Sequence, residues 1–242
     1  YELGVSSGAT LGVALWILVV QNTGFAGLIF SALFGGICSL ILVLMFSTRV
    51  KGASLLIVGL MLGYIAGGLV GVLVYFSEDN ALRSFLIWSF GTFSATGREH
   101  LLWILAVVIL CLLPLPVMAK PMNLMLLGED MALSMGVRVR RIRIVMIVLS
   151  SALASVCTAF CGPIAFLGLA VPHAARAIFA TEDHRYLIPA SALLGACMAL
   201  VADVFSQLPQ SGQILPLNSM MAVMGAPAVI YLLLKGQNEA TA

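Results

Sequence analysis

The stretch AKPMNLMLLGEDMALSMGVRVRRIR, residues 119–143, is a charged segment that lies between two long apolar runs. It holds five of the chain's twelve Lys and Arg residues and two of its ten acidic residues, although charged residues make up only 9% of the whole. Because a charge inside a lipid bilayer is costly, an apolar chain that gathers charge in one internal segment places that segment in water. The segment is therefore expected to connect two membrane-embedded parts of the chain.

The middle of this segment predicts a short surface helix. Glu129 and Asp130 stand where a helix N-terminus favours negative charge, and Gly136 stands where a left-handed C-cap is expected. The apolar side of the helix comprises Met131, Ala132, Leu133 and Met135. Four arginines then lead into the next apolar run, as cations do at a cytoplasmic membrane border: Arg138, Arg140, Arg141 and Arg143. An ordinary polar loop is the alternative interpretation.

The composition of the 242-residue chain indicates an integral membrane protein. Hydrophobic residues make up 62% of it, whereas soluble domains are nearer 45–50% apolar and about 25% charged. The net charge of +2 provides no large basic face, so we expect no nucleic-acid partner.

Eight apolar segments predict membrane spans, because a helix needs about 20 largely apolar residues to cross the bilayer. They cover residues 4–20, 25–46, 53–76, 101–118, 144–160, 164–180, 186–206 and 214–235. Cys161-Gly162-Pro163 ends the fifth span, because proline removes a backbone donor and restricts the residue before it. Residues 77–100 mix charges with aromatic residues, which is typical of an interfacial helix. The fold class is therefore all-α, a polytopic transmembrane helix bundle forming one domain over residues 1–242.

The distribution of basic residues orients these spans in the membrane. One side carries Arg49, Lys51, Lys120, Arg138, Arg140, Arg141, Arg143, Arg176, Arg185 and Lys235, and the other carries only Arg83 and Arg98. Positively charged loops stay in the cytoplasm. The segment 119–143 is thus predicted to be cytoplasmic, and the segment 77–100 extracytoplasmic.

Glycines recur at a spacing of four in the third span, at Gly59, Gly63, Gly67 and Gly71. Small residues on one stripe let helices approach closely, so packing is the favoured interpretation. The alternative is that this stripe lines a path or permits a hinge.

The residues that commonly carry catalysis do not form a recognisable constellation. The sequence has neither a phosphate-binding G-x-x-x-x-G-K-[ST] loop nor an H-E-x-x-H pair. The five cysteines lie in apolar runs without further ligands nearby, so we expect no metal site. The three histidines are interpreted as interfacial or capping residues. Asp203 is the one acid inside a span, which leaves open a secondary transporter driven by an ion gradient. A membrane anchor without transport activity is a third interpretation.

Five blocks of sequence carry a family resemblance. They are LGVSSGA at 3–9; WSFG at 88–91; KPMN at 120–123 with LGE at 127–129 through Gly136-Val137; GPIAFLGL at 162–169 with VPH at 171–173 and Arg176; and DHR at 183–185 with Ala202-Asp203 and GAP at 225–227. These blocks, in this order, resemble the FecCD family, the permeases of bacterial ABC importers for iron chelates, haem and cobalamin. The resemblance covers essentially all 242 residues.

The resemblance implies a type II ABC importer in the bacterial inner membrane. Two permease copies would pair around the pathway, together with two ATP-binding subunits and a periplasmic substrate-binding protein. ATP and Mg²⁺ would bind the partner subunit, so this chain would be no enzyme and would hold no cofactor. Family members have ten spans and the LGVSSGA block precedes the third, so the chain is expected to correspond to spans three to ten.

The resemblance also implies three groups of site residues. ATPase coupling would involve Leu127, Gly128, Glu129, Asp130, Ala132, Met135, Gly136 and Arg138. The pathway and its gates would involve Gly59, Gly63, Gly67, Trp88 and Gly91. The binding protein would dock on Arg83, Arg98 and Gln207, the last standing where some members have Arg. The expected substrate is an iron chelate, either siderophore or haem, or cobalamin.

Overall fold

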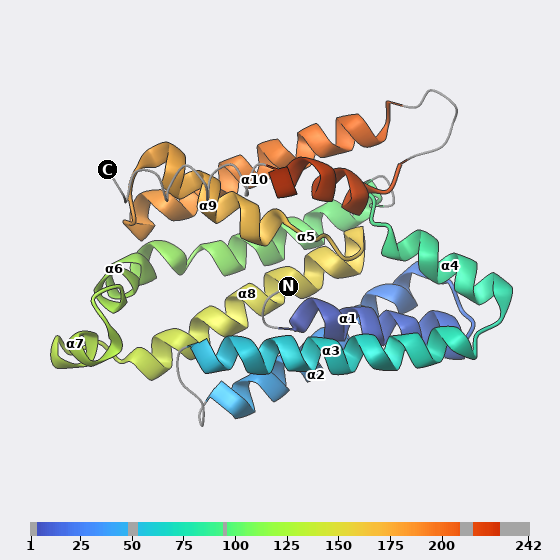
Figure 1. Ribbon diagram of the computed structural model, residues 1–242, viewed down its shortest axis with the longest axis horizontal. Coiled ribbons are helices and arrows are strands. Elements are labelled where there is room, and N and C mark those ends of the chain that lie inside the picture. Colours follow the sequence, from blue (N-terminus) through green and yellow to red (C-terminus); the bar gives the residue numbers. More distant parts are fainter. Residues whose placement is uncertain (1–3, 48–52, 94–95, 209–214, 228–242) are drawn as a thin grey trace. The chain divides into compact units, whose positions relative to one another are not determined.

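A computed structural model describes residues 4–47, 53–93, 96–208 and 215–227. Every element assigned in these ranges is helical (Figure 1), which confirms the predicted all-α class. The chain divides into two compact units. Unit 1 comprises residues 1–113 with 140–163, and unit 2 comprises residues 114–139 with 164–242.

Unit 1 is built around its first helix, which packs against the next two. Its elements are α1 (Val5–Ala14), the π-helix η1 (Leu15–Val19), α2 (Phe25–Ser47), α3 (Ala53–Tyr75), α4 (Asp79–Ser89), α5 (Arg98–Leu112) and α8 (Val139–Cys161). Small residues allow this packing: a β-carbon on Gly12 would overlap the Ser31 carbonyl, and one on Gly35 would overlap the Gly8 carbonyl. Close backbone contact of this kind favours helix association in lipid, where the hydrophobic drive between helices is weak.

Hydroxyl groups add hydrogen bonds between the helices of unit 1. The Ser6 hydroxyl on α1 lies 3.1 Å from the Thr158 hydroxyl on α8, and both residues are buried. The Ser39 hydroxyl on α2 donates to the Gly4 carbonyl over 2.9 Å. These bonds satisfy polar groups that have no access to water.

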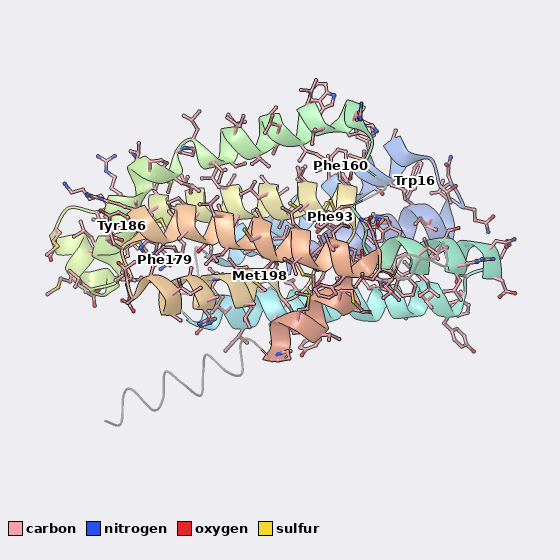
Figure 2. All side chains as sticks on the ribbon, turned by 90° about the horizontal axis from the view of Figure 1, so that it is seen from above. Trp16, Phe93, Phe160, Phe179, Tyr186 and Met198 are labelled. Carbon is pink, nitrogen blue, oxygen red and sulfur yellow. The ribbon has the colours of Figure 1, made fainter. Side chains whose placement is uncertain are left out.

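Unit 2 contains α6 (Leu115–Met125), α7 (Glu129–Ser134), α9 (Leu167–Phe179) and α10 (His184–Ser206), and residues 217–227 are also helical. Helices α9 and α10 pack through Ala175, Leu187 and Ala190, with Leu194 beside them. Phe179 and Tyr186 lie on either side of the α9–α10 turn (Figure 2), with 52% and 67% of their surface exposed. Aromatic residues beside a polar turn are typical of a membrane interface.

Among the described residues, four helices are long and apolar enough to cross a membrane: Ala26–Ser47, Ser54–Tyr75, Val139–Cys161 and His184–Ser206. A fifth crossing is formed if the bent pair His100–Leu112 and Leu115–Met125 is one span. Val5–Val19 and Leu167–Phe179 are shorter apolar helices. Helical residues thus fall in all eight predicted segments, and the chain is a membrane protein.

The fourth predicted span differs from the structure at its C-terminal end. We expected it to end at Pro114 and Pro116, but the chain bends by 44° there and a helix continues to Met125. Pro116 occupies the first turn of α6, where a missing backbone N–H removes no helical hydrogen bond. The prolines therefore begin a new helix. Several predictions fall on residues outside the described ranges, namely Leu3 of the first block, the basic turn with Arg49 and Lys51, most of the loop at 207–213, and Lys235 with the end of the last span.

Candidate functional site

The predicted short helix of the charged segment is present as α7, and glycines bound it at both ends. Gly128 has φ 103° and ψ 151° at the N-cap, and Gly136 has φ 83° just after the helix. At the C-terminal end, Gly136 N–H donates to the Leu133 carbonyl over 3.0 Å and Val137 N–H to the Ala132 carbonyl over 3.0 Å. This is the Schellman arrangement, which requires a left-handed residue. The predicted glycine cap is confirmed.

The α7 helix presents apolar side chains on its surface. Among its six residues only Ala132 is buried, and Glu129 and Asp130 lie in its first turn. The large apolar residues in and around the helix are between 51% and 58% exposed: Leu126, Leu127, Met131, Leu133 and Met135. Arg138 is also exposed. The eight predicted coupling residues therefore lie within one stretch, residues 127–138, most of which is exposed.

A side-chain network joins the end of α6, just before this segment, to the start of α10. The Asn123 amide donates to Asp183 Oδ1 over 2.6 Å. Its oxygen accepts the backbone N–H of His184 over 2.9 Å and lies 2.7 Å from His184 Nδ1. Asp183 Oδ1 also accepts the backbone N–H of Arg185 over 2.9 Å and so caps α10. This contact between distant segments has no signal in the sequence.

These bonds favour the ionised form of the Asp183 carboxyl group. Its pKa is lowered from the usual 3.8, first by the hydrogen bond from the Arg185 backbone and then by that from the Asn123 side chain. Donors to a carboxylate favour its ionised form.

The ends of α4 and α8 meet in unit 1 through two glycines of positive φ, Gly91 at 72° and Gly162 at 77°. The Thr92 backbone N–H donates to the Cys161 carbonyl over 2.9 Å. Trp88 lies in the last turn of α4, and its indole nitrogen is buried without a hydrogen-bond partner among the described residues. The predicted gate residues Trp88 and Gly91 therefore belong to a tight joint between two helix ends.

The glycine stripe of α3 is in contact only over its first half. The backbones of Gly59 and Gly63 lie against Gly4, where a β-carbon would be 2.5 Å from the Gly59 carbonyl oxygen. A β-carbon on Gly67 or Gly71 would meet nothing within 4 Å in the described part of the chain. Helix packing explains the first two glycines and not the others.

The predicted docking residues lie in different units and are exposed. Arg83 is on α4 and Arg98 begins α5. Gln207 follows α10, and its amide donates to Asp203 Oδ2 over 2.8 Å. Asp203, the acid of the secondary-transport interpretation, therefore lies in the last turn of its helix with an amide partner.

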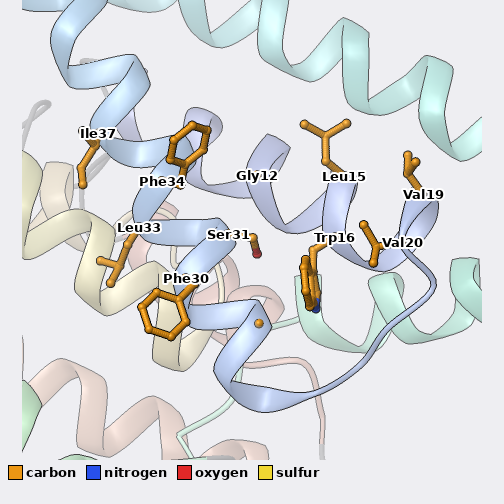
Figure 3. Close-up of a pocket in the computed structure, with 11 residues that line it drawn as sticks. Gly12, Leu15, Trp16, Val19, Val20, Phe30, Ser31, Leu33, Phe34 and Ile37 are labelled. Carbon is orange, nitrogen blue, oxygen red and sulfur yellow. The ribbon is translucent and has the colours of Figure 1, made fainter.

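An apolar cavity of about 820 Å³ lies between α1–η1 and α2 (Figure 3). Trp16, Leu15 and Val19 line one wall, and Phe30 and Phe34 the other. The described residues that line it are apolar apart from the Ser31 hydroxyl and the Trp16 indole nitrogen. Among the described residues, no group of three or more His, Cys, Asp or Glu side chains is placed to hold a metal ion.

Long apolar helices and an exposed, charged connection define a polytopic α-helical membrane protein. Comparison with known proteins identifies its family. The FecCD transport family matches residues 1–235. The vitamin B12 import system permease protein BtuC of Citrobacter koseri is 34% identical over 238 residues, which cover 97% of this chain and 71% of that protein. The hemin transport system permease protein HmuU of Yersinia pestis is 32% identical over 244 residues, covering 98% and 72%.

A solved structure gives the same result at the level of the fold. An inward-facing conformation of a protein described as a metal-chelate type ABC transporter matches with a TM-score of 0.90 and 30% sequence identity, covering 97% of this chain and 75% of that one. The chain belongs to the FecCD transport family.

Proposed function

We propose that the chain is the permease subunit of an ATP-driven importer that carries an iron chelate, haem or cobalamin across the bacterial inner membrane. The family membership and the B12 and hemin import permeases among its relatives support this function. A second permease copy, two ATP-binding subunits and a periplasmic binding protein complete the importer. ATP and Mg²⁺ are bound by the ATP-binding subunits.

The observation that carries the proposal is the form of α7. A six-residue helix bounded by Gly128 and Gly136, with exposed apolar side chains, is costly to present to water unless a partner covers it. The proposed partner is the ATP-binding subunit, which contacts Leu127, Met135 and the neighbouring residues. Helix α7 leads through Arg138 directly into α8, so movement of the subunit is transmitted to a membrane-spanning helix.

The opposite end of α8 offers a site for gating. The joint of Gly91 with Gly162 attaches α4 to the end of α8. Opening and closing of the outer end of the path is assigned to α4 with α3, whose Gly67 has room around it. Arg83, Arg98 and Gln207 are assigned to docking of the binding protein.

Reconstitution tests this function directly. The permease is placed in proteoliposomes with the ATP-binding subunit, and uptake of radiolabelled cyanocobalamin, haemin and an iron–siderophore chelate is measured in the presence of the matching binding protein. ATP inside the vesicles is expected to drive uptake of one of these probes, and an uncoupler is expected to leave that uptake unchanged. Uptake that an uncoupler abolishes, with no need of ATP, would instead establish the ion-driven alternative with Asp203.

A further inference from the structure

Asn123 connects two helices that are 60 residues apart in sequence, and it uses both ends of its amide to do so. The nitrogen donates to Asp183 Oδ1 over 2.6 Å, and the oxygen accepts from the His184 backbone over 2.9 Å. The same oxygen lies 2.7 Å from His184 Nδ1. Because an amide oxygen only accepts, the imidazole donates its proton there. One side chain thus fixes the backbone start and a side chain of α10.

The bridge lies next to the coupling segment in the chain. Asn123 is in the last turn of α6, five residues before Gly128. The intervening residues form turns, since Leu126 N–H donates to the Asn123 carbonyl over 3.2 Å and Gly128 N–H to the Met125 carbonyl over 3.1 Å. Helix α6 lies beside α10 in unit 2 (Figure 1). Asn123 therefore ties the end of α6 to the start of α10, and this end of α6 is the base from which α7 extends.

Most of the surface of α7 is exposed among the described residues. Ala132 is its one buried residue, and Leu126 and Leu127 before it are more than half exposed. A force applied to the apolar surface of α7 reaches α10 to the extent that the end of α6 is held against α10. The hydrogen bond of an amide to the carboxylate of Asp183 is charge-assisted, and such bonds are stronger and more directional than neutral ones.

We propose that Asn123 is a positioning residue that holds the base of α7 against α10, so that the push of an ATP-binding subunit reaches α10 and not only α8. The inference rests on the proposed function. It adds a second route for the movement: α8 follows α7 in the chain, whereas α10 is reached from the end of α6, which packs beside α10 and is joined to it by the bonds of Asn123 with Asp183 and His184. Without the bridge, ATP hydrolysis continues but moves less substrate.

The test is the number of ATP molecules hydrolysed for each molecule of cyanocobalamin or haemin taken up by the reconstituted complex. Asn123→Ala removes the bridge. Asn123→Asp keeps the size of the side chain but sets a carboxylate against Asp183. Both variants are expected to raise the ratio roughly fivefold or more. Asp183→Asn retains an oxygen for both donors but removes the charge, so the ratio is expected to rise less than in either Asn123 variant. Asn22→Ala is the matched control, because in the described part of the chain the Asn22 amide oxygen accepts the Gly24 N–H within its own turn over 2.7 Å.

The ratio separates positioning from folding. A variant that merely folds less well forms fewer complexes and lowers hydrolysis and uptake by the same factor. An unchanged ratio in both Asn123 variants would overturn the inference, and so would an equal rise in Asn22→Ala. If the wild-type complex itself shows no ATP-driven uptake of any probe, the proposed function fails, which is a distinct result.

Discussion

Gly91 and Gly162 approach so closely that a β-carbon on Gly162 would lie 3.0 Å from the α-carbon of Gly91. The same β-carbon would be 2.6 Å from the Trp88 carbonyl oxygen. Both obstacles are backbone atoms, which a side-chain rotation cannot remove. The end of α8 and the end of α4 therefore meet at a distance that only glycine allows.

Gly162→Ala is expected to lower the free energy of unfolding by about 2 kcal/mol or more, because it adds overpacking to a positive φ. Thermal unfolding in detergent micelles measures the loss. Gly168→Ala is the matched control, since a β-carbon there meets no described atom within 4 Å and its φ is not positive. A similar loss in both variants would contradict the close contact.

Gly136→Val is expected to reduce ATP-driven uptake while the permease remains inserted in the membrane. The Gly136 φ of 83° excludes a β-branched residue, so the cap of α7 would be lost. Gly136→Asn is the control, because asparagine tolerates the left-handed region, and it should retain most of the uptake. Normal uptake with valine at 136 would count heavily against a coupling role.

Reversal of the charges on Glu129 and Asp130 is expected to reduce uptake as well, since positive charge at a helix N-terminus is unfavourable.

The Ser6–Thr158 contact is expected to contribute about 0.6 kcal/mol to stability and at most about 1.7 kcal/mol, the average and the maximum for interhelical hydrogen bonds measured by double-mutant cycles in a membrane protein. A double-mutant cycle with Ser6→Ala and Thr158→Val isolates the coupling energy between the two hydroxyl groups. Unfolding in bicelles provides the four free energies. Thr158→Ser retains the hydroxyl and serves as the reference, although it removes a methyl group. A coupling energy near zero would show that the hydroxyl groups make no net bond.

The sequence was sufficient to locate the apolar helices and α7, because each depends on local rules. A span requires a run of apolar residues, and the cap at Gly136 follows from one residue in the left-handed region. The prediction that the fourth span ends at Pro114 and Pro116 is wrong, since the chain bends there and continues as α6, and a proline pattern alone does not tell whether a helix stops or a new one begins.

Contacts between distant segments were beyond prediction from a single sequence. Gly91 with Gly162 and Asn123 with Asp183 are pairs whose members lie in separate resemblance blocks. Each of these residues belongs to a block of the family resemblance, but the sequence around a block does not indicate which other block it contacts. The π-helix over Leu15–Val19 has the apolar sequence of an ordinary α-helix, so its i to i+5 bond from Val20 N–H to the Leu15 carbonyl has no sequence signal. The roles assigned to the coupling, gate and docking residues remain predictions.

The carboxylate of Asp183 is expected to make the stability of the protein depend on pH in the acidic range. Its pKa in the folded protein lies below the usual 3.8, because the Arg185 backbone and the Asn123 amide donate to the ionised form. The folded state thus binds fewer protons than the unfolded state, so this contribution to stability is fully present above 3.8 and is lost as the pH falls through the folded pKa. Asp183→Asn keeps an acceptor for both donors but does not titrate. The difference in unfolding temperature between wild type and Asp183→Asn should therefore be constant near neutral pH and should shift in favour of the variant below pH 3.8. Asn123→Ala should reduce that shift, because it removes the second of the two donors. A difference that does not change with pH would contradict the prediction, because it would mean that the pKa of Asp183 is the same in the folded and the unfolded protein.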